Sequence, residues 1–196
     1  MTEIVEARKP GRPRSTECDE QILRAAMEEY AENGFDGMSV DAVAARAGVS
    51  KATIYRRYPS KLELVAASIF GLAEAAAPKP DTGSLRGDLQ ASLHNLSQLV
   101  ADPVLGQCIR TMVPDGIRNP ELGQVHEHFV RHRRAGTIAA LERAIARGEL
   151  RAGLDVELAA DVIAGPLFYR HLVSHMPIDD DYVDGVIDVF VAAYGS

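Results

Sequence analysis

Hydrophobic residues recur along most of this 196-residue chain at the three- and four-residue spacing of an α-helix. The pattern extends from Ile22 to Val191, and no stretch shows the sustained alternation of apolar and polar residues that is typical of a β-strand. We therefore expect an all-α fold of about nine helices.

Capping residues and helix breakers indicate where these helices begin and end. Serine, threonine, aspartate or asparagine often precedes an expected start, and glycine or proline follows several ends. In the N-terminal part, helices are expected over residues 16–34, 40–47, 51–57 and 61–77. In the C-terminal part, they are expected over residues 85–101, 104–112, 120–147, 156–174 and 180–194, with a bend at Gly165 and Pro166.

Pro78 and Pro80 separate two parts of the chain and are interpreted as a hinge. The arm before the first helix is rich in lysine and arginine and contains no apolar run. The expected units are a flexible basic arm over 1–15, a three-helix domain over 16–60, a connecting helix over 61–77 and a helical domain over 78–196.

Two short helices of the N-terminal domain are separated only by the turn Gly48-Val49. A longer helix precedes them, which is the arrangement of a helix-turn-helix module whose second short helix enters the major groove of DNA. Ala52 and Thr53 are small enough to let that helix approach the bases, and Lys51 lies at its N-terminus, where phosphate is favoured. The pattern predicts a DNA-binding domain.

The net charge of −7 at first argues against a partner that is itself an anion. The basic residues, however, are concentrated in the arm and around the second short helix, whereas acidic residues dominate from Asp81 onward. The clustered cations are Arg8, Lys9, Arg12, Arg14, Lys51, Arg56, Arg57 and Lys61. Only the N-terminal part of the chain is therefore expected to attract phosphate.

The segment SVDAVAARAGVSKATIYRRYPSKLELVAA closely resembles the DNA-binding domain of the TetR (tetracycline-repressor) family. The resemblance is specific over residues 21–76, although Arg57 stands where histidine is common and Tyr58 where phenylalanine is common. It implies an N-terminal helix-turn-helix domain followed by a C-terminal helical domain that binds a ligand and dimerises. It also implies a repressor that binds a pseudo-palindromic operator as a homodimer and is released by a small-molecule effector, which the candidate pocket residues given below indicate to be largely apolar.

The predicted contacts with double-stranded operator DNA combine this resemblance with the charge pattern. Family members typically touch the operator from the positions of Ser50, Lys51, Thr53, Tyr55 and Lys61. The full predicted set is Arg12, Arg14, Ser39, Ser50, Lys51, Ala52, Thr53, Tyr55, Arg56, Arg57 and Lys61.

The arm contains KPGRPR, which resembles the Gly-Arg-Pro core of an AT-hook. In such a segment proline keeps the chain extended while arginine enters a narrow A·T-rich minor groove. One interpretation places Arg12 and Arg14 in the minor groove beside each half-site. The alternative is a disordered basic tail that attracts DNA without specificity.

The last two helices carry enough apolar residues to form a four-helix seam with a second copy, as the resemblance implies. The alternative is that these residues face the protomer's own core. The predicted interface residues are Leu158, Val162, Leu167, Leu172, Val183, Val186, Ile187, Phe190 and Val191.

A ligand pocket is expected inside the helices of the C-terminal domain. Ordinary core packing is the alternative for each candidate residue. The predicted lining is Leu72, Leu96, Val100, Cys108, Met112, Phe129 and Phe168, with His132, Tyr169 and His171 as polar groups. Coupling to DNA is expected to run through the connecting helix, from Lys61 to Leu72.

Two histidine pairs, His128 with His132 and His171 with His175, have the i,i+4 spacing that metal ligands require on one helix face. Neither pair has a cysteine or carboxylate cluster beside it, so a satisfied or solvent-facing histidine is favoured and no metal site is predicted. A metal-responsive regulator and a helical adaptor remain alternatives. The adaptor would leave the basic second short helix unexplained.

No nucleophile, phosphate-loop or dinucleotide motif is present, so an enzyme is not expected and no cofactor is predicted. Cys18 and Cys108 are far apart and lack zinc-finger spacing, which fits a reducing cytoplasm. A secretory leader or membrane span is not expected either, because long apolar runs are missing.

Overall fold

The computed structural model describes residues 16–74 and 79–196, and it confirms the all-α fold. Over the described residues the chain forms nine α-helices and one π-helical segment, η1. Their bounds are α1 Thr16–Gly37, α2 Val40–Ala47, α3 Lys51–Tyr55, α4 Lys61–Glu74, α5 Leu85–Ala101, α6 Pro103–Arg118, α7 Pro120–Ala146, α8 Val156–Tyr169, η1 Arg170–Ser174 and α9 Asp180–Tyr194.

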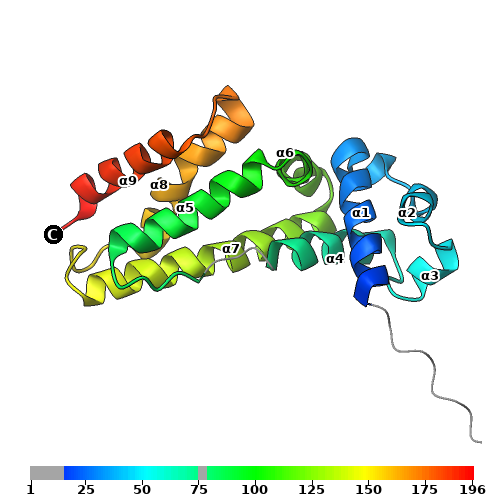
Figure 1. Ribbon diagram of the computed structural model, residues 1–196, viewed down its shortest axis with the longest axis horizontal. Helices are drawn as coiled ribbons and strands as arrows, with labels where there is room; N and C mark the ends of the chain where they lie inside the picture. The colour runs from blue at the N-terminus through cyan, green and yellow to red at the C-terminus, as the bar shows by residue number, and fades with distance from the viewer. Residues whose placement is uncertain (1–15, 75–78) are drawn as a thin grey trace, which may run out of the picture.

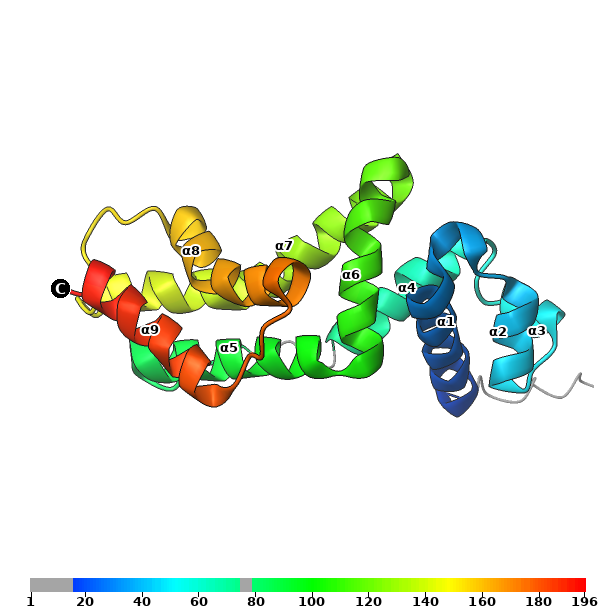
Figure 2. The ribbon, with the colours of Figure 1, turned by 90° about the horizontal axis from the view of Figure 1, so that it is seen from above.

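The molecule is elongated, with the helix-turn-helix at one end and the C-terminus at the other (Figure 1). We call α1–α3 the head and α5–α9 the body. The long α7 extends along the body toward the head, where it meets α4. Figure 2 shows α6 lying across the long axis between head and body, where it packs against α1 on one side and α7 on the other.

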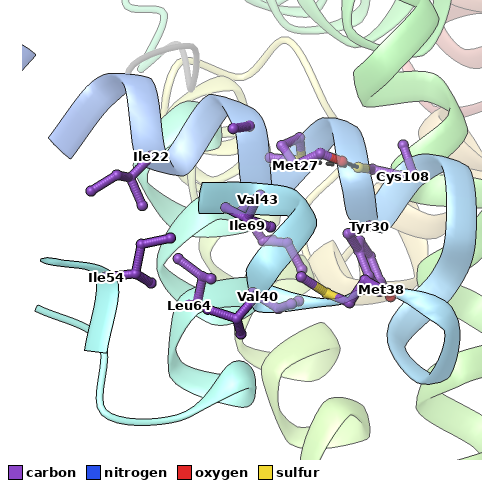
Figure 3. Close-up of a cluster of buried hydrophobic side chains, with 14 of the residues drawn as sticks. Ile22, Met27, Tyr30, Met38, Val40, Val43, Ile54, Leu64, Ile69 and Cys108 are labelled. Carbon is purple, nitrogen blue, oxygen red and sulfur yellow. Dashed lines mark hydrogen bonds between the residues drawn. The ribbon is translucent and has the colours of Figure 1, made fainter. Parts of the chain in front are cut away.

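The head has a hydrophobic core that it shares with the body (Figure 3). Ile22 of α1, Ile54 of α3 and Leu64 of α4 face one another, and each is fully buried. Cys108 and Met112 of α6 belong to the same buried cluster. Because burial of one such aliphatic side chain contributes about 1.5–3 kcal/mol, this shared core joins head and body firmly.

A second core lies inside the body, away from the head. It is built from the inward faces of α5, α7, α8 and α9, with Leu150 of the α7–α8 connection. Its fully buried large side chains include Leu89, Leu141, Ile163 and Ile187. These helices form a bundle whose opposite faces remain available for other contacts.

The predicted ends of α1 and α6 are wrong, and one contact between the two helices explains both differences. α1 continues past the predicted end at Gly34, which breaks the helix with φ 66° and ψ 178° before one further turn. α6 continues through Pro114, beyond the predicted end at Met112. The carboxylate of Asp115 on this added turn accepts a hydrogen bond from the Phe35 N–H at 2.9 Å, so each extension supports the other.

The other differences are smaller. α3 ends at Tyr55, two residues before the predicted end, because the chain already turns toward Pro59 there. The predicted helix over 156–174 changes after Tyr169 into the π-helical segment η1, three residues beyond Pro166. A proline in a helix interior removes one backbone hydrogen bond, which favours such irregular geometry nearby.

Candidate DNA-binding site and ligand cavity

Local hydrogen bonds build the α2–turn–α3 unit. The Ser39 hydroxyl caps α2 by accepting the Ala42 N–H at 3.1 Å, and Ser50 caps α3 by accepting the Thr53 N–H at 3.2 Å. Between them Gly48 adopts φ 66°, a left-handed conformation that glycine tolerates best. These caps fix the angle between the two short helices.

α3 is anchored by one side chain and exposes most of the others. Ile54 is fully buried in the head core. The side of α3 opposite Ile54 is open, and we call its exposed residues, with the two capping serines, the α3 face. The α3 face consists of Ser39, Ser50, Lys51, Ala52, Tyr55 and Arg56, with the half-buried Thr53 beside them.

Lys51 is the cation at the start of α3. Its ammonium donates a hydrogen bond to the Asp41 carboxylate of α2 at 2.9 Å, and this contact raises the pKa of Lys51. Both side chains are largely exposed, so the pair is screened and can open at little cost. Lys51 is therefore a charged group within reach of an anion in front of the α3 face.

Arg57 and Lys61 lie differently from the other predicted DNA contacts, because both bind within the head. The guanidinium of Arg57 pairs with the Asp19 carboxylate of α1, and its side chain is only 14% exposed. The Lys61 ammonium donates to the Phe35 carbonyl at 2.7 Å and lies 4.5 Å from the centre of the Phe35 ring. In this geometry both cations hold helices together. The predicted Arg12 and Arg14 lie outside the described residues.

The comparisons with known proteins agree with this geometry. The family profile described as "Bacterial regulatory proteins, tetR family" matches residues 22–68, and "Tetracyclin repressor-like, C-terminal domain" matches residues 79–190. The uncharacterized HTH-type transcriptional regulator YdeS of Bacillus subtilis is 37% identical over 184 residues, covering 93% of this chain and 92% of YdeS. The chain belongs to the TetR family.

A further relative and a solved structure are also similar to this TetR-family chain. The DNA-binding transcriptional repressor TetR of Mycobacteroides abscessus is 33% identical over 174 residues, covering 85% of this chain and 88% of that protein. The crystal structure of the transcriptional regulator FadR from Bacillus subtilis in complex with stearoyl-CoA has the same fold, with a TM-score of 0.71. It is 24% identical and covers 88% of this chain and 97% of FadR. The chain is thus a DNA-binding transcriptional regulator, of a class that is not enzymatic.

The body of this TetR-family chain contains a cavity of about 450 Å³ between α5, α6, α7, α8 and η1, which we call the central cavity. Most of its wall is hydrocarbon, from Leu93, Leu96, Leu99, Ile109, Met112, Phe129, Val130, Ile163, Phe168 and Leu172. Its remaining lining residues are Ser92, His126, Arg133, Arg134, Thr137, Ala160, Asp161, Ala164 and Gly165. Its volume lies within the range of roughly 300–1,000 Å³ that is usual for small-molecule sites.

The structure brings some of the predicted pocket residues together at this cavity and places others elsewhere. Leu96, Met112, Phe129 and Phe168 line it. The other predicted residues whose side chains the structure describes do not line the central cavity, namely Val100, Cys108, His132, Tyr169 and His171. Val100 and His171 line a separate cavity. The side chain of Leu72 lies outside the described residues.

The misplaced residues have identifiable surroundings. The Cys108 thiol lies 2.9 Å from the Met27 sulfur in the head core, and burial raises its pKa to about 12. The imidazole of His171 is hydrogen-bonded to the Gly106 carbonyl at 2.9 Å, and Val100 is buried beside Leu99. His132 and Tyr169 are exposed.

Polar cavity residues of α7 were missed by the sequence analysis, although a signal for them exists. His126, Val130, Arg133 and Thr137 follow one another at spacings of four, three and four residues, so they form a single stripe on α7. The stripe mixes charged and apolar residues, which conceals it from a search for hydrophobic periodicity.

The histidine pairs do not gather further ligands. His128 packs edge-on against Phe70 of α4, with ring centres 4.9 Å apart. In residues 16–74 and 79–196 there is no group of three or more histidine, cysteine, aspartate or glutamate side chains that could hold a metal ion. Over the same ranges, none of the helices is both long and apolar enough for a membrane span.

The predicted dimer residues divide into two sets. Leu167, Val183, Ile187 and Phe190 are buried in the protomer's own core, so for them the interface prediction is wrong and the core alternative holds. Leu172, Val186 and Val191 are half-buried at the edges of that packing. Leu158 and Val162 are exposed, and so are further apolar side chains that the prediction missed, Tyr169, Val173, Met176 and Val189.

Proposed function

We propose that this chain is a ligand-responsive transcriptional repressor that binds a pseudo-palindromic operator as a homodimer. The observation that carries the proposal is the α3 face. α3 is fixed to the protein by Ile54, while Lys51, Tyr55 and Arg56 project from its open side. A short helix that is rigidly held and exposes cationic and aromatic groups suits the major groove, where phosphate contacts position it and base contacts give specificity.

Dimerisation is supported by the outer surface of α8, η1 and α9, which we call the seam. Leu158, Val162, Tyr169 and Val173 follow one another at spacings of four, seven and four residues, which places them along one side of α8 and η1. Val189 of α9 is 72% exposed and Leu158 is 55% exposed. An exposed apolar stripe of this length is unusual on a monomer and fits a symmetric interface that presents two heads to DNA, roughly 34–36 Å apart.

Ligand response is supported by the position of α6. Met112 of α6 belongs to the head core and also lines the central cavity, and Phe129 of α7 packs against the same core. The far end of α6 binds α1 through Asp115. A ligand that moves α6 therefore acts directly on α1, and we assign the coupling to α6 in addition to α4.

The proposal is tested with duplex DNA from the intergenic region beside the protein's own gene. Footprinting should reveal a protected two-fold site, and a small-molecule screen by thermal shift should find compounds that stabilise the protein. At least one stabilising compound should release the footprint. If compounds that bind in the body leave operator affinity unchanged, ligand-responsive repression is contradicted.

A further inference from the structure

The central cavity is lined by Arg133, whose positive charge is not balanced by a carboxylate among the described residues. Arg133 of α7 lines the cavity and donates from Nη2 to the Asn95 amide oxygen of α5 at 2.7 Å. Its other terminal nitrogen, Nη1, is buried and has no hydrogen-bond partner among the described residues. Within residues 16–74 and 79–196, no carboxylate forms an ion pair with Arg133.

An enclosed guanidinium nitrogen without a partner lowers the stability of the folded protein. Burial lowers the pKa of the Arg133 guanidinium, which shows that water stabilises its charge less there than at the surface. Arginine nevertheless stays protonated in proteins, so the charge cannot be removed. A buried cation with an unused donor is unfavourable unless an anion pairs with it.

The other polar groups of the cavity do not have this property. Arg134 is held by two carboxylates, Asp161 of the cavity lining and Glu157 outside it, and its Nη2 lies 2.8 Å from the Glu157 oxygen. Burial lowers the pKa of His126, so its ring is neutral near pH 7 and offers a hydrogen bond but no charge. Arg133 is therefore the cavity residue that an anion would pair with.

We propose that the central cavity binds an amphipathic monocarboxylate, whose carboxylate pairs with Arg133 while its hydrocarbon part lies against Leu96, Ile109 and Phe168. This inference rests on the proposed ligand-responsive function and specifies the chemistry of its ligand. Arginine pairs with a carboxylate through parallel N–H donors. Nη1 is the donor without a partner, and a turn of the Arg133 side chain toward the cavity would bring this enclosed atom to the anion. The apolar wall excludes water and strengthens that pair.

The same geometry sets the selectivity of the site. A neutral molecule of equal length gains the apolar contacts and leaves Nη1 unpaired. A cation is repelled by Arg133, although Asp161 lies in the wall, because that carboxylate is already bound by Arg134. Arg133 balances only one of the two negative charges of a dianion. A single negative charge at the end of an apolar molecule is the best match.

The test measures binding of a carboxylate panel to the full-length protein by calorimetry and thermal shift. The panel contains octanoate, decanoate, dodecanoate and 4-phenylbutyrate, with decanamide as the neutral probe and decylamine as the cationic one. Arg133→Met removes the cation and keeps apolar volume. Arg131→Met is the matched control, since Arg131 is an exposed residue of the same helix and does not line the central cavity.

We expect at least one carboxylate to bind the wild-type protein and the Arg131→Met variant equally, and to bind Arg133→Met about tenfold or more weakly. Arg133→Met should unfold at the same or a higher temperature than wild type, because an unpaired buried charge is removed. The inference is overturned if no carboxylate of the panel binds, if Arg133→Met binds as tightly as wild type, or if decanamide or decylamine binds more tightly than decanoate.

Operator release is measured separately, so that the two proposals can fail independently. A carboxylate that binds through Arg133 but does not change operator affinity supports the assignment of the ligand and contradicts ligand-responsive repression. Release of the operator by a ligand whose binding is insensitive to Arg133→Met supports the regulatory proposal and overturns the carboxylate assignment.

Discussion

At the scale of single residues, the basic side chains near α3 form two groups: some are exposed to solvent, and others bind to groups of the protein itself. Lys51 and Arg56 are exposed on the α3 face, whereas Arg57 and Lys61 are bound inside the head. Sequence alone could not separate them, since all four lie within eleven residues and the same charge serves DNA binding or packing. The ion pair of Arg57 depends on Asp19, which is 38 residues away in the chain.

Arg57→Met should therefore act mainly on stability. The pair with Asp19 is largely shielded from water, so its loss leaves a half-buried carboxylate without its cation. We expect the free energy of unfolding to fall by about 1–3 kcal/mol, measured by urea denaturation. Asp19→Asn should cost a similar amount, and the double variant less than the sum. Additive costs would show that the two side chains do not interact.

At the scale of helices, the sequence predicted best where short-range hydrogen bonds decide. α2 was predicted without error because Ser39 and Gly48 fix its ends locally. α6 was predicted too short because its last turn depends on Asp115 contacting Phe35 of a distant helix. The seam shows a similar limit: periodicity identified the apolar helices, but it could not tell which side, such as that of Leu158 or of Ile187, faces inward.

Asp115→Ala tests whether α6 carries the signal between cavity and head. The Phe35 N–H would lose its acceptor beside the break at Gly34, so we expect a loss of about 1–2 kcal/mol in the free energy of unfolding. Ligand binding in the body should persist while its effect on operator affinity weakens. Asp36→Ala, an exposed neighbour, is the control. If the ligand still changes operator affinity as much as in the wild type, α6 does not carry the signal through Asp115.

At the scale of the whole molecule, the two ends have separate tasks. The head presents the α3 face, and the outer side of the body presents the seam on α8, η1 and α9 (Figure 1). The cavity and α6 lie between them, so a ligand is placed where it can bias the position of the head. The fold of each part was predictable, but this arrangement depends on long-range packing.

Charge placed at the seam should separate the protomers. Val189→Glu puts a carboxylate on a side chain that is 72% exposed, so the protomer's fold should be unaffected. Light scattering should then report a dimer for wild type and a monomer for the variant, because an unpaired charge is costly inside an apolar interface. Glu142→Gln, exposed on α7, serves as the control. A Val189→Glu dimer as tight as wild type would place the interface elsewhere.

Stability should also depend on pH through two histidines. Burial lowers the pKa of His126, and it lowers the pKa of His171 as well, where Arg110 and His175 add repulsion and the Gly106 carbonyl opposes the shift. The folded state thus binds fewer protons than the unfolded state below about pH 6.5. The stability that the two neutral histidines contribute should be fully present above that pH and should be lost as the pH falls below it. Urea denaturation at a series of pH values measures this free energy of unfolding. His171→Gln should flatten this decline. An unchanged slope would contradict the assignment.

The central claim, that the α3 face binds operator DNA, is tested most directly by fluorescence anisotropy with the intergenic duplex over a range of salt concentrations. We predict saturable binding that weakens steeply with salt. The slope of the salt dependence should fall by about two for each of Lys51→Ala and Arg56→Ala, because each substitution removes one cation from both protomers of the bound dimer. Arg131→Ala should leave both unchanged. Binding that is absent, or that retains its affinity and salt slope in the Lys51→Ala/Arg56→Ala double variant, would contradict the claim.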